Sequence, residues 1–336
     1  MKVVLCLFFP FLLLTTLVAQ DLVITPIGEI LCKPGVINKS PGKGFLIEYE
    51  LNPDIRMRSN NAASLSNPTK VGVNKRFNLK LKAPLINKEK FKMLVGWNYY
   101  SEEYKFTYVG QDNASIFNNI DDEHLKSSRI SLYAIRPINH KYYVAIKAVA
   151  SYNGDYDGAL SFDERYTRYD FAGIFGVKKR TNLEWGVGLL VRKNFTKSFP
   201  LLPFAVYNQT FNAKWGVEIT FPTSLQGRYN FNKKSLLLFG PQYQSRSYSI
   251  DITDKATNIE APYLLRRSEL RFNVRYDHNI KSWLWLELST GYVRNFSTRF
   301  DVVEKGADVG LTKVTPTNGP FFKFGLFLSP PKYNHK

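Results

Sequence analysis

The residues best suited to chemistry are charged side chains that recur at every second position of several segments. In residues 269–277, odd positions are charged or polar and even positions are apolar or aromatic. Related alternation runs through residues 69–83, 183–194 and 212–222. A strand points successive side chains to opposite faces, so each segment has one apolar face and one charged face. The charges predicted on the inner face are Arg76, Lys80, Lys82, Glu184, Arg192, Lys214, Glu218, Arg267, Glu269, Arg271, Arg275, Asp277 and Glu287.

Two kinds of chemistry fit such an interior. If the interior is wet and open, its excess of Arg and Lys favours the passage of anions. If it is narrow, opposite charges pair across neighbouring strands and fill it. The sequence leaves both interpretations open.

A second candidate site is a calcium-type loop at residues 153–164. Asn153, Asp155, Asp157 and Glu164 stand at positions 1, 3, 5 and 12 of the twelve-residue pattern, with glycine at position 6. Hard oxygen ligands from a flexible loop suit calcium, which is the one cofactor that the sequence suggests. The alternative is a solvated acidic loop rich in turn-forming residues.

A third candidate is a lipase-like or deacylase-like site facing the outer leaflet. Such a site needs a histidine beside a nucleophile. His124, which precedes Ser127 and Ser128, is the histidine expected in a long loop. The sequence contains no nucleophile-elbow motif. We therefore assign no catalytic residues and favour a non-enzymatic role.

The first residues predict secretion. A short basic start at Lys2, an apolar run over residues 3–18 and the Ala19–Gln20 junction are typical of a cleaved signal peptide, residues 1–19. We expect a periplasmic lead-in at residues 20–42, a barrel at 43–329 and a tail at 330–336. One cysteine follows the signal peptide, so no intrachain disulfide is expected.

Composition supports a membrane protein built of strands. The chain has 336 residues, a formal net charge of +18, 20 Tyr and 25 Phe, but no later apolar run of about eighteen residues that would make a spanning helix. The basic charge would suit nucleic acid or an anionic membrane surface. Secretion favours the membrane, so the expected partners are outer-membrane lipid, lipopolysaccharide and the barrel-assembly machinery. The sequence does not identify a small-molecule solute.

These charges require a wall of strands to position them. We predict an all-β, transmembrane, antiparallel up-and-down barrel of fourteen strands, or twelve if a hairpin within residues 201–232 is misread. Short links on one side and mostly long links on the other are typical of outer-membrane barrels with periplasmic termini. A soluble periplasmic β-protein is the alternative. The predicted strands are 43–52, 69–83, 90–101, 127–136, 141–151, 168–179, 183–194, 201–208, 212–222, 225–232, 235–250, 265–277, 283–296 and 320–329.

The residues also resemble a family. The Ala19–Gln20 junction and residues 40–45, 260–270 and 319–326 are similar to an uncharacterised outer-membrane β-barrel family, of unknown function, common in Bacteroidota. The resemblance implies the fold and the location in a Gram-negative outer membrane, and it supplies no catalytic residues. We therefore expect a narrow porin-like channel or solute-uptake protein, or a structural barrel that presents loops.

Overall fold

The computed structural model describes most of the predicted barrel. The described residues are 34–59, 69–110, 114–121, 124–193, 200–254, 259–281, 283–302 and 312–329. The predicted signal peptide and C-terminal tail lie outside the described residues, as does most of the predicted lead-in.

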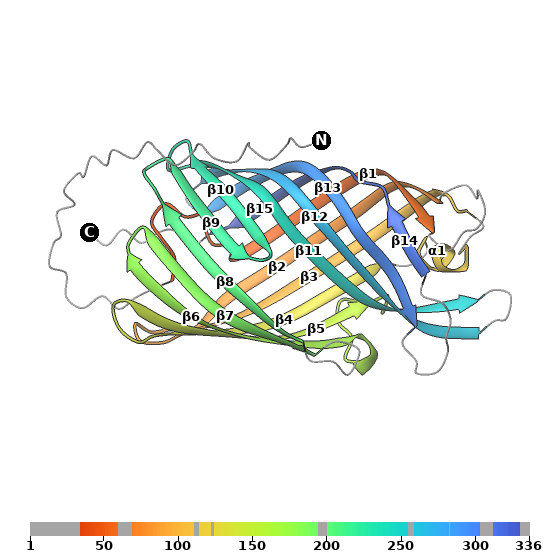
Figure 1. Cartoon of the computed structure of the whole chain (residues 1–336), viewed down its shortest axis with the longest axis horizontal. Coiled ribbons are helices and arrows are strands. Elements are labelled where there is room, and N and C mark those ends of the chain that lie inside the picture. The colour runs from red at the N-terminus through yellow and green to blue at the C-terminus, as the bar shows by residue number, and fades with distance from the viewer. Residues whose placement is uncertain are drawn as a thin grey trace, which may run out of the picture. The chain divides into compact units, whose positions relative to one another are not determined.

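The described chain forms one antiparallel sheet that closes on itself (Figure 1). From β1 to β13, each strand pairs with the next, and β15 pairs with both β1 and β13. The strands are β1 (Phe45–Ser59), β2 (Thr69–Asn87), β3 (Lys92–Tyr108), β4 (Leu125–Pro137), β5 (Tyr142–Gly154), β6 (Thr167–Arg180), β7 (Leu183–Lys193), β8 (Leu201–Thr210), β9 (Trp215–Phe221), β10 (Ser224–Asn230), β11 (Ser235–Asp254), β12 (Ile259–Lys281), β13 (Leu284–Val302), β14 (Thr312–Pro316) and β15 (Gly319–Leu328).

The wall has fourteen strand positions. β14 pairs with the same two strands as β15, farther along them, so the two are parts of one wall strand interrupted at residues 317–318. The predicted fourteen-strand barrel is confirmed. Residues 201–232 form the three separate strands β8, β9 and β10, which excludes the twelve-strand alternative.

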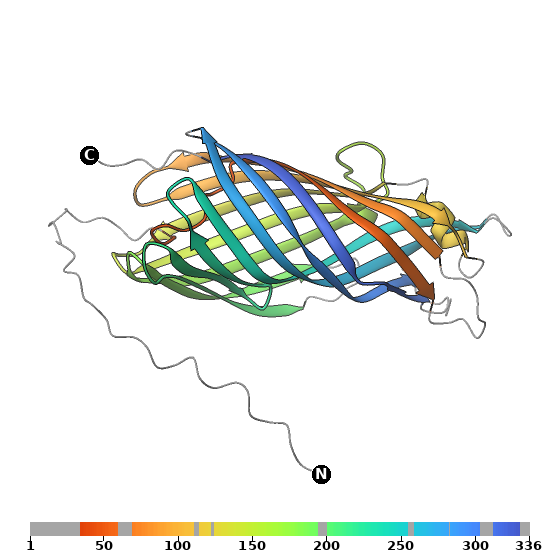
Figure 2. The same cartoon turned by 90° about the horizontal axis from the view of Figure 1, so that it is seen from above.

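The two ends of the barrel differ in their connections. Six links of two to four residues lie at one end, here called the short-turn end: 88–91, 138–141, 181–182, 211–214, 231–234 and 282–283. The opposite, long-loop end carries α1 (Ala114–Asp121) and η1 (Glu164–Tyr166), and α1 lies there in both Figure 1 and Figure 2. In the described ranges, no helix is long and apolar enough to cross a membrane.

The outer face of the wall is apolar and the inner face is polar. On β1, Ile47 and Tyr49 are 40% and 42% exposed, whereas Glu48 and Glu50 are 9% and 7% exposed. Exposed apolar side chains recur on most of the other strands, including Phe171, Leu189, Phe272 and Phe324 among many. A soluble sandwich buries its apolar faces between two sheets. A closed wall with an apolar exterior is instead typical of a transmembrane barrel.

The strands are unequal in length, although about ten residues were expected for each. β11, β12 and β13 have 20, 23 and 19 residues, whereas β9 and β10 have seven each. These strands are longer than predicted because their ladder pairing continues into segments that were predicted to be loops. Beyond Gln242, the last residue that pairs with β10, β11 continues until Ser249 pairs in parallel with Gly154 of β5. The long-loop end is therefore drawn together across the interior.

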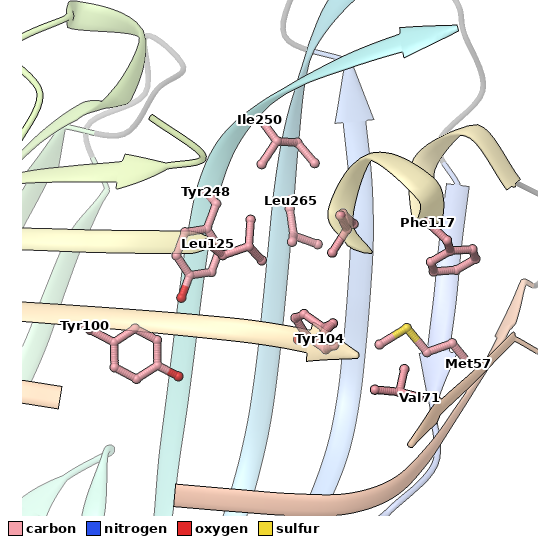
Figure 3. Packing of buried hydrophobic residues seen from close by; sticks show 10 residues of the cluster. Met57, Val71, Tyr100, Tyr104, Phe117, Leu125, Tyr248, Ile250 and Leu265 are labelled. Atoms are coloured by element: carbon pink, nitrogen blue, oxygen red, sulfur yellow. The ribbon is translucent and has the colours of Figure 1, made fainter. Parts of the chain in front are cut away.

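A hydrophobic cluster fills the interior at the long-loop end (Figure 3). Phe117 of α1 is 1% exposed and lies in one cluster with residues of strands that are not neighbours in the wall. Burial of this apolar surface holds α1 against the barrel end. The cluster consists of Met57, Val71, Tyr100, Tyr104, Phe117, Ile120, Leu125, Tyr248, Ile250 and Leu265.

Candidate functional site

On the side of the hydrophobic cluster that faces the short-turn end, three arginines and three glutamates form the central charge cluster. Arg76 Nη1 lies 3.1 Å from Glu50 Oε1 and 3.1 Å from Glu269 Oε1. Arg271 Nη2 lies 2.7 Å from Glu50 Oε1. All six side chains are buried, and each carboxylate lies within ion-pair distance of at least two guanidinium groups. The members are Arg76, Arg267, Arg271, Glu50, Glu102 and Glu269.

The central charge cluster crosses the interior of the barrel. Arg76 is on β2 and Glu269 is on β12, and β1, β15 and β13 separate these strands in the wall. Their contact can therefore form only through the interior. A cavity lined by Arg76, Tyr104 and Arg267 has a volume of 20 Å³, which holds about one water molecule. This cavity is therefore too small for a larger solute.

A second set of paired charges, the basal charge cluster, lies closer to the short-turn end. Lys323 Nζ is 3.1 Å from both Glu48 Oε1 and Glu287 Oε1, and Lys43 also contacts Glu287. The cluster is again balanced, with three cations and three carboxylates. Its members are Lys43, Lys323, Arg275, Glu48, Glu287 and Asp277.

The chain that precedes β1 lies in the short-turn mouth of the barrel. The Gly35 backbone N–H donates to Glu184 Oε2 at 2.8 Å. The backbone N–H and the hydroxyl of Ser40 donate to the two oxygens of Glu218, at 2.9 and 2.7 Å. Ile37 N–H donates to the carbonyl of Thr181, in a short turn, at 3.0 Å. Residues 34–43, here called the N-terminal segment, are therefore held mainly by carboxylates of the wall.

Small residues make room for the groups that orient these carboxylates. The Tyr143 hydroxyl donates to Glu184 Oε1 at 2.6 Å, and a side chain at Gly176 would collide with the Tyr143 ring. In the same way, Gly216 leaves space for the guanidinium of Arg228, which lies 2.9 Å from Glu218.

The remaining predicted inner-face charges are distributed differently. Lys82 Nζ lies 4.3 Å from the centre of the Tyr133 ring, a cation–π contact. Lys80 is half-buried opposite Leu46 in the β1–β2 ladder. Lys214 lies exposed in the turn between β8 and β9, outside both charge clusters. Arg192 pairs with Asp170 on β6.

Sequence reasoning missed five of the twelve charges in these two clusters. Glu48 and Glu50 alternate with exposed apolar residues on β1, and Lys323 stands between two exposed phenylalanines on β15. The same period of two therefore marked them as inner-face residues. Glu102 follows directly after the predicted end of its strand at residue 101, whereas β3 continues to Tyr108.

The structure does not bring the four predicted calcium ligands together. Asn153 is buried and bonds to serine hydroxyls of β4 and β5. Asp155 Oδ2 accepts from the backbone N–H of Asp251 at 2.8 Å, while Asp157 and Glu164 are exposed. Among the described residues, no three His, Cys, Asp or Glu side chains are placed to hold a metal. Calcium binding at this loop stays a prediction.

Asp163, which precedes the predicted calcium ligand Glu164, is hydrogen-bonded to an arginine. Its carboxylate accepts from the backbone N–H of Arg165 at 2.8 Å and from Arg165 Nε at 2.9 Å. These two hydrogen bonds hold the pKa of Asp163 below its ordinary value. Arg165 also pairs with Asp251 at 3.1 Å, so it bridges two of the connections at the long-loop end.

The structure also does not assemble the predicted histidine–serine pair. His124 is exposed, whereas Ser127 and Ser128 are buried. Ser127 Oγ donates to the Asn153 side chain at 2.6 Å, and Ser128 Oγ accepts from Trp97 Nε1 at 2.8 Å. In the described part of the chain, His124 bonds to neither serine.

A different serine and histidine do meet, on neighbouring strands near the short-turn end. Ser235 Oγ lies 2.8 Å from His278 Nδ1, and the Tyr276 hydroxyl lies 3.3 Å from both. Among the described residues, no carboxylate bonds to the second nitrogen of His278. Without that orienting group, the trio is a hydrogen-bonded wall contact and not a catalytic triad. The residues are 43 positions apart, so spacing could not have revealed the pair.

The chain was compared with curated proteins and with solved structures. No curated protein matches it. A deltaS2 mutant of the monoaromatic hydrocarbon channel TodX is similar with a TM-score of 0.39 and 7% identity, over 88% of this chain and 91% of that chain. The toluene transporter TodX of Pseudomonas putida gives 0.32 and 10%, over 85% and 88%. The outer membrane protease OmpT of Escherichia coli gives 0.28 and 8%, over 87% and 99%.

The family comparison covers most of the wall. Residues 49–306, which include all strands from β2 to β13, match the family described as "Domain of unknown function (DUF6268)". The chain belongs to this family.

Proposed function

We propose that this protein is a gated outer-membrane channel for small solutes, and that its N-terminal segment is the gate at the periplasmic mouth. The observation that carries the proposal is the attachment of that segment. Residues 34–43 lie in the short-turn mouth through hydrogen bonds to Glu184 and Glu218 and an ion pair to Glu287.

The way in which the segment is held supports a gate. It precedes β1 and belongs to no ladder of the wall, so its departure breaks no strand pairing. Its described contacts are chiefly hydrogen bonds, which stabilise by only about 1 kcal/mol each, or about 1.5–3 kcal/mol where a charged group takes part. A few such bonds can be exchanged for water or for a binding partner, whereas the wall cannot open at that cost.

A route beside the charge clusters also supports transport. The central and basal charge clusters draw their members from β1, β2, β3, β12, β13, β15 and the N-terminal segment. Apart from Lys147 on β5, the inner face along the middle of β5 to β8 carries small or apolar side chains, among them Ala145, Ala172, Gly188 and Phe204. Rotation of such uncharged side chains costs less than the separation of buried ion pairs. We therefore place the route along β5 to β8.

The architecture supports a location in the outer membrane. The short-turn end faces the periplasm and the long-loop end faces outward, as in outer-membrane barrels generally. Export would use the predicted signal peptide at residues 1–19, and insertion would use the barrel-assembly machinery. The apolar outer face would contact lipid and lipopolysaccharide.

A filled structural barrel is the second candidate. The cavity of 20 Å³ beside the central charge cluster favours it, because that cavity admits nothing larger than a water molecule. A filled structural barrel predicts no increase in conductance when the N-terminal segment is removed, whereas the gate predicts an increase.

Single-channel recording in a planar bilayer separates the two. The purified mature chain is compared with a variant that lacks residues 34–42 and with the double variant Glu184→Gln/Glu218→Gln. We expect rare openings for the mature chain and frequent, larger conductance steps for both variants. Heat-modifiable gel migration checks that each variant keeps its barrel. If folded variants stay silent, or if all three proteins conduct alike, the gate proposal is wrong.

A further inference from the structure

Four arginines converge on the inner face near the long-loop end, and the described residues place a single carboxylate among them. They come from β4, β6, β7 and β11, and Asp170 on β6 is the carboxylate. Arg129 and Arg168 lie in one row of the wall, because both pair with Ser151 of the strand between them. Arg192 is paired directly with Asp170 in the β6–β7 ladder. The arginine cluster consists of Arg129, Arg168, Arg192 and Arg246.

Asp170 satisfies only part of this cluster. Its Oδ1 atom lies 2.8 Å from Arg192 Nε and 3.7 Å from Arg168 Nε. Within the described residues, Arg129 forms no ion pair, and the buried Nε atoms of Arg129 and Arg168 have no hydrogen-bond partner. Arg129 interacts electrostatically with two further arginines, Arg246 and Arg168.

Arg246 adds positive charge rather than a counter-charge. Its guanidinium lies 3.5 Å from the centre of the Tyr100 ring, which is a cation–π contact. Glu102 also acts on Arg246, but Arg76 and Arg267 already bond to both oxygens of that carboxylate. The arginine cluster therefore has four cations and one carboxylate of its own.

This imbalance sets it apart from the other interior charges. The central and basal charge clusters each match three cations with three carboxylates. Buried cations without counter-charges are costly, and proteins normally pair them or hold a ligand there. Buried guanidinium groups with unused donors are suited to planar, bidentate binding of oxyanions.

We infer that the arginine cluster is a binding site for a doubly charged oxyanion, namely a phosphate or sulfate group. An excess of three positive charges favours a dianion over a carboxylate or chloride, each of which would neutralise only one. The side chain of Arg192 is 27% exposed, so water and solutes reach the edge of the site. The inference goes beyond the proposed channel, because an anion can bind here whether or not the barrel conducts.

The test is a thermal-melting titration of the full mature chain at constant ionic strength. The probes are inorganic phosphate, sulfate and chloride with the protein in detergent, and phosphatidic acid with the protein in nanodiscs. We expect a saturable rise in Tm with phosphate or sulfate and none with chloride. Arg129→Gln and Arg168→Gln should each weaken the binding about tenfold or more, as the loss of a charged hydrogen bond does.

A matched control keeps the result specific. Lys82→Gln removes one interior positive charge outside the cluster and should leave the titration unchanged. In buffer without phosphate or sulfate, Arg129→Gln should raise Tm, because it relieves an uncompensated charge. This readout also shows that the variant is folded.

The outcomes separate the sources of the anion and the two proposals. A shift that depends on Arg129 with inorganic phosphate identifies a free anion, and one seen only with phosphatidic acid identifies a lipid headgroup. Either supports the site. No saturable shift with any probe, or an undiminished shift in both arginine variants, would overturn it. Because binding is measured without conduction, failure here leaves the gate standing, and a silent gate leaves the anion site standing.

Discussion

Arg76 on β2 and Glu269 on β12 form an ion pair across the interior, 193 residues apart in the chain. Each also bonds to further members of the central charge cluster, so the pair links two strands that are not neighbours in the barrel wall. The contact stabilises the closed ring from inside, in addition to the ladders between neighbouring strands.

Arg76→Gln should destabilise the barrel strongly. The change leaves Glu50, Glu102 and Glu269 buried with one cation fewer, and loss of one partner from a buried ion pair costs about 3–5 kcal/mol. Urea unfolding in detergent micelles, followed by heat-modifiable gel migration, measures the effect. Arg180→Gln, at an exposed turn of the short-turn end, should change the unfolding midpoint little. Equal effects of the two variants would contradict a central role for the cluster.

Leu189→Arg tests the membrane-facing wall. Leu189 lies near the middle of β7 and is 51% exposed on the outer face. A cation at the bilayer midplane destabilises a barrel by about 2–4 kcal/mol. We expect less folded protein in lipid vesicles. Phe162→Arg places the same charge on an exposed loop residue and should fold normally. Normal folding of Leu189→Arg would argue against lipid contact at this position.

A labelling experiment tests how the N-terminal segment is held. Ser40→Cys, made in a Cys32→Ser background so that maleimide has a single target, keeps its backbone bond to Glu218 but sits in the closed mouth, so maleimide should react slowly. Adding Glu218→Gln removes the charged acceptor and should speed labelling about tenfold or more. Ser40→Cys with Lys233→Gln, in an exposed turn at the same end, is the control. Fast labelling of Ser40→Cys alone would show that the segment does not rest in the mouth.

Calcium should leave the melting temperature unchanged. Asn153 Oδ1 and Asp155 Oδ2 already accept hydrogen bonds from protein donors, so ligation through these two atoms would have to break those bonds first. Melting with millimolar calcium against magnesium measures the effect. A calcium-specific rise that disappears in Asp157→Ala and in Asp155→Ala would instead establish the site that the spacing of residues 153–164 predicts.

Period-two alternation was sufficient to predict the wall. The alternation in residues 269–277 predicts which side chains of β12 face inward and which face outward, and the structure confirms the strand. Strand ends were less predictable, because they depend on pairing between segments and not on local pattern. Residues 251–264 lay between two predicted strands, yet Pro262 pairs with Asp251 in the β11–β12 ladder.

The partners of the interior charges could not be predicted from local spacing. Alternation placed Arg76 and Glu269 on inner faces, but only closure of the ring makes them neighbours. The same applies to the arginine cluster. Arg129 and Arg168 lay in predicted strands, and their shared row with Ser151 depends on the register of β4, β5 and β6.

The shortness of β9 and β10 has a consequence for the surrounding lipid. Seven residues extend over about 23 Å along the strand, and over less along the membrane normal because barrel strands tilt. The hydrocarbon core of a typical bilayer is about 30 Å thick. Lipids beside this part of the wall have to compress to match it, at a cost that grows with each ångström of mismatch. We therefore expect the barrel to thin its membrane most beside β9 and β10, which favours thin bilayers.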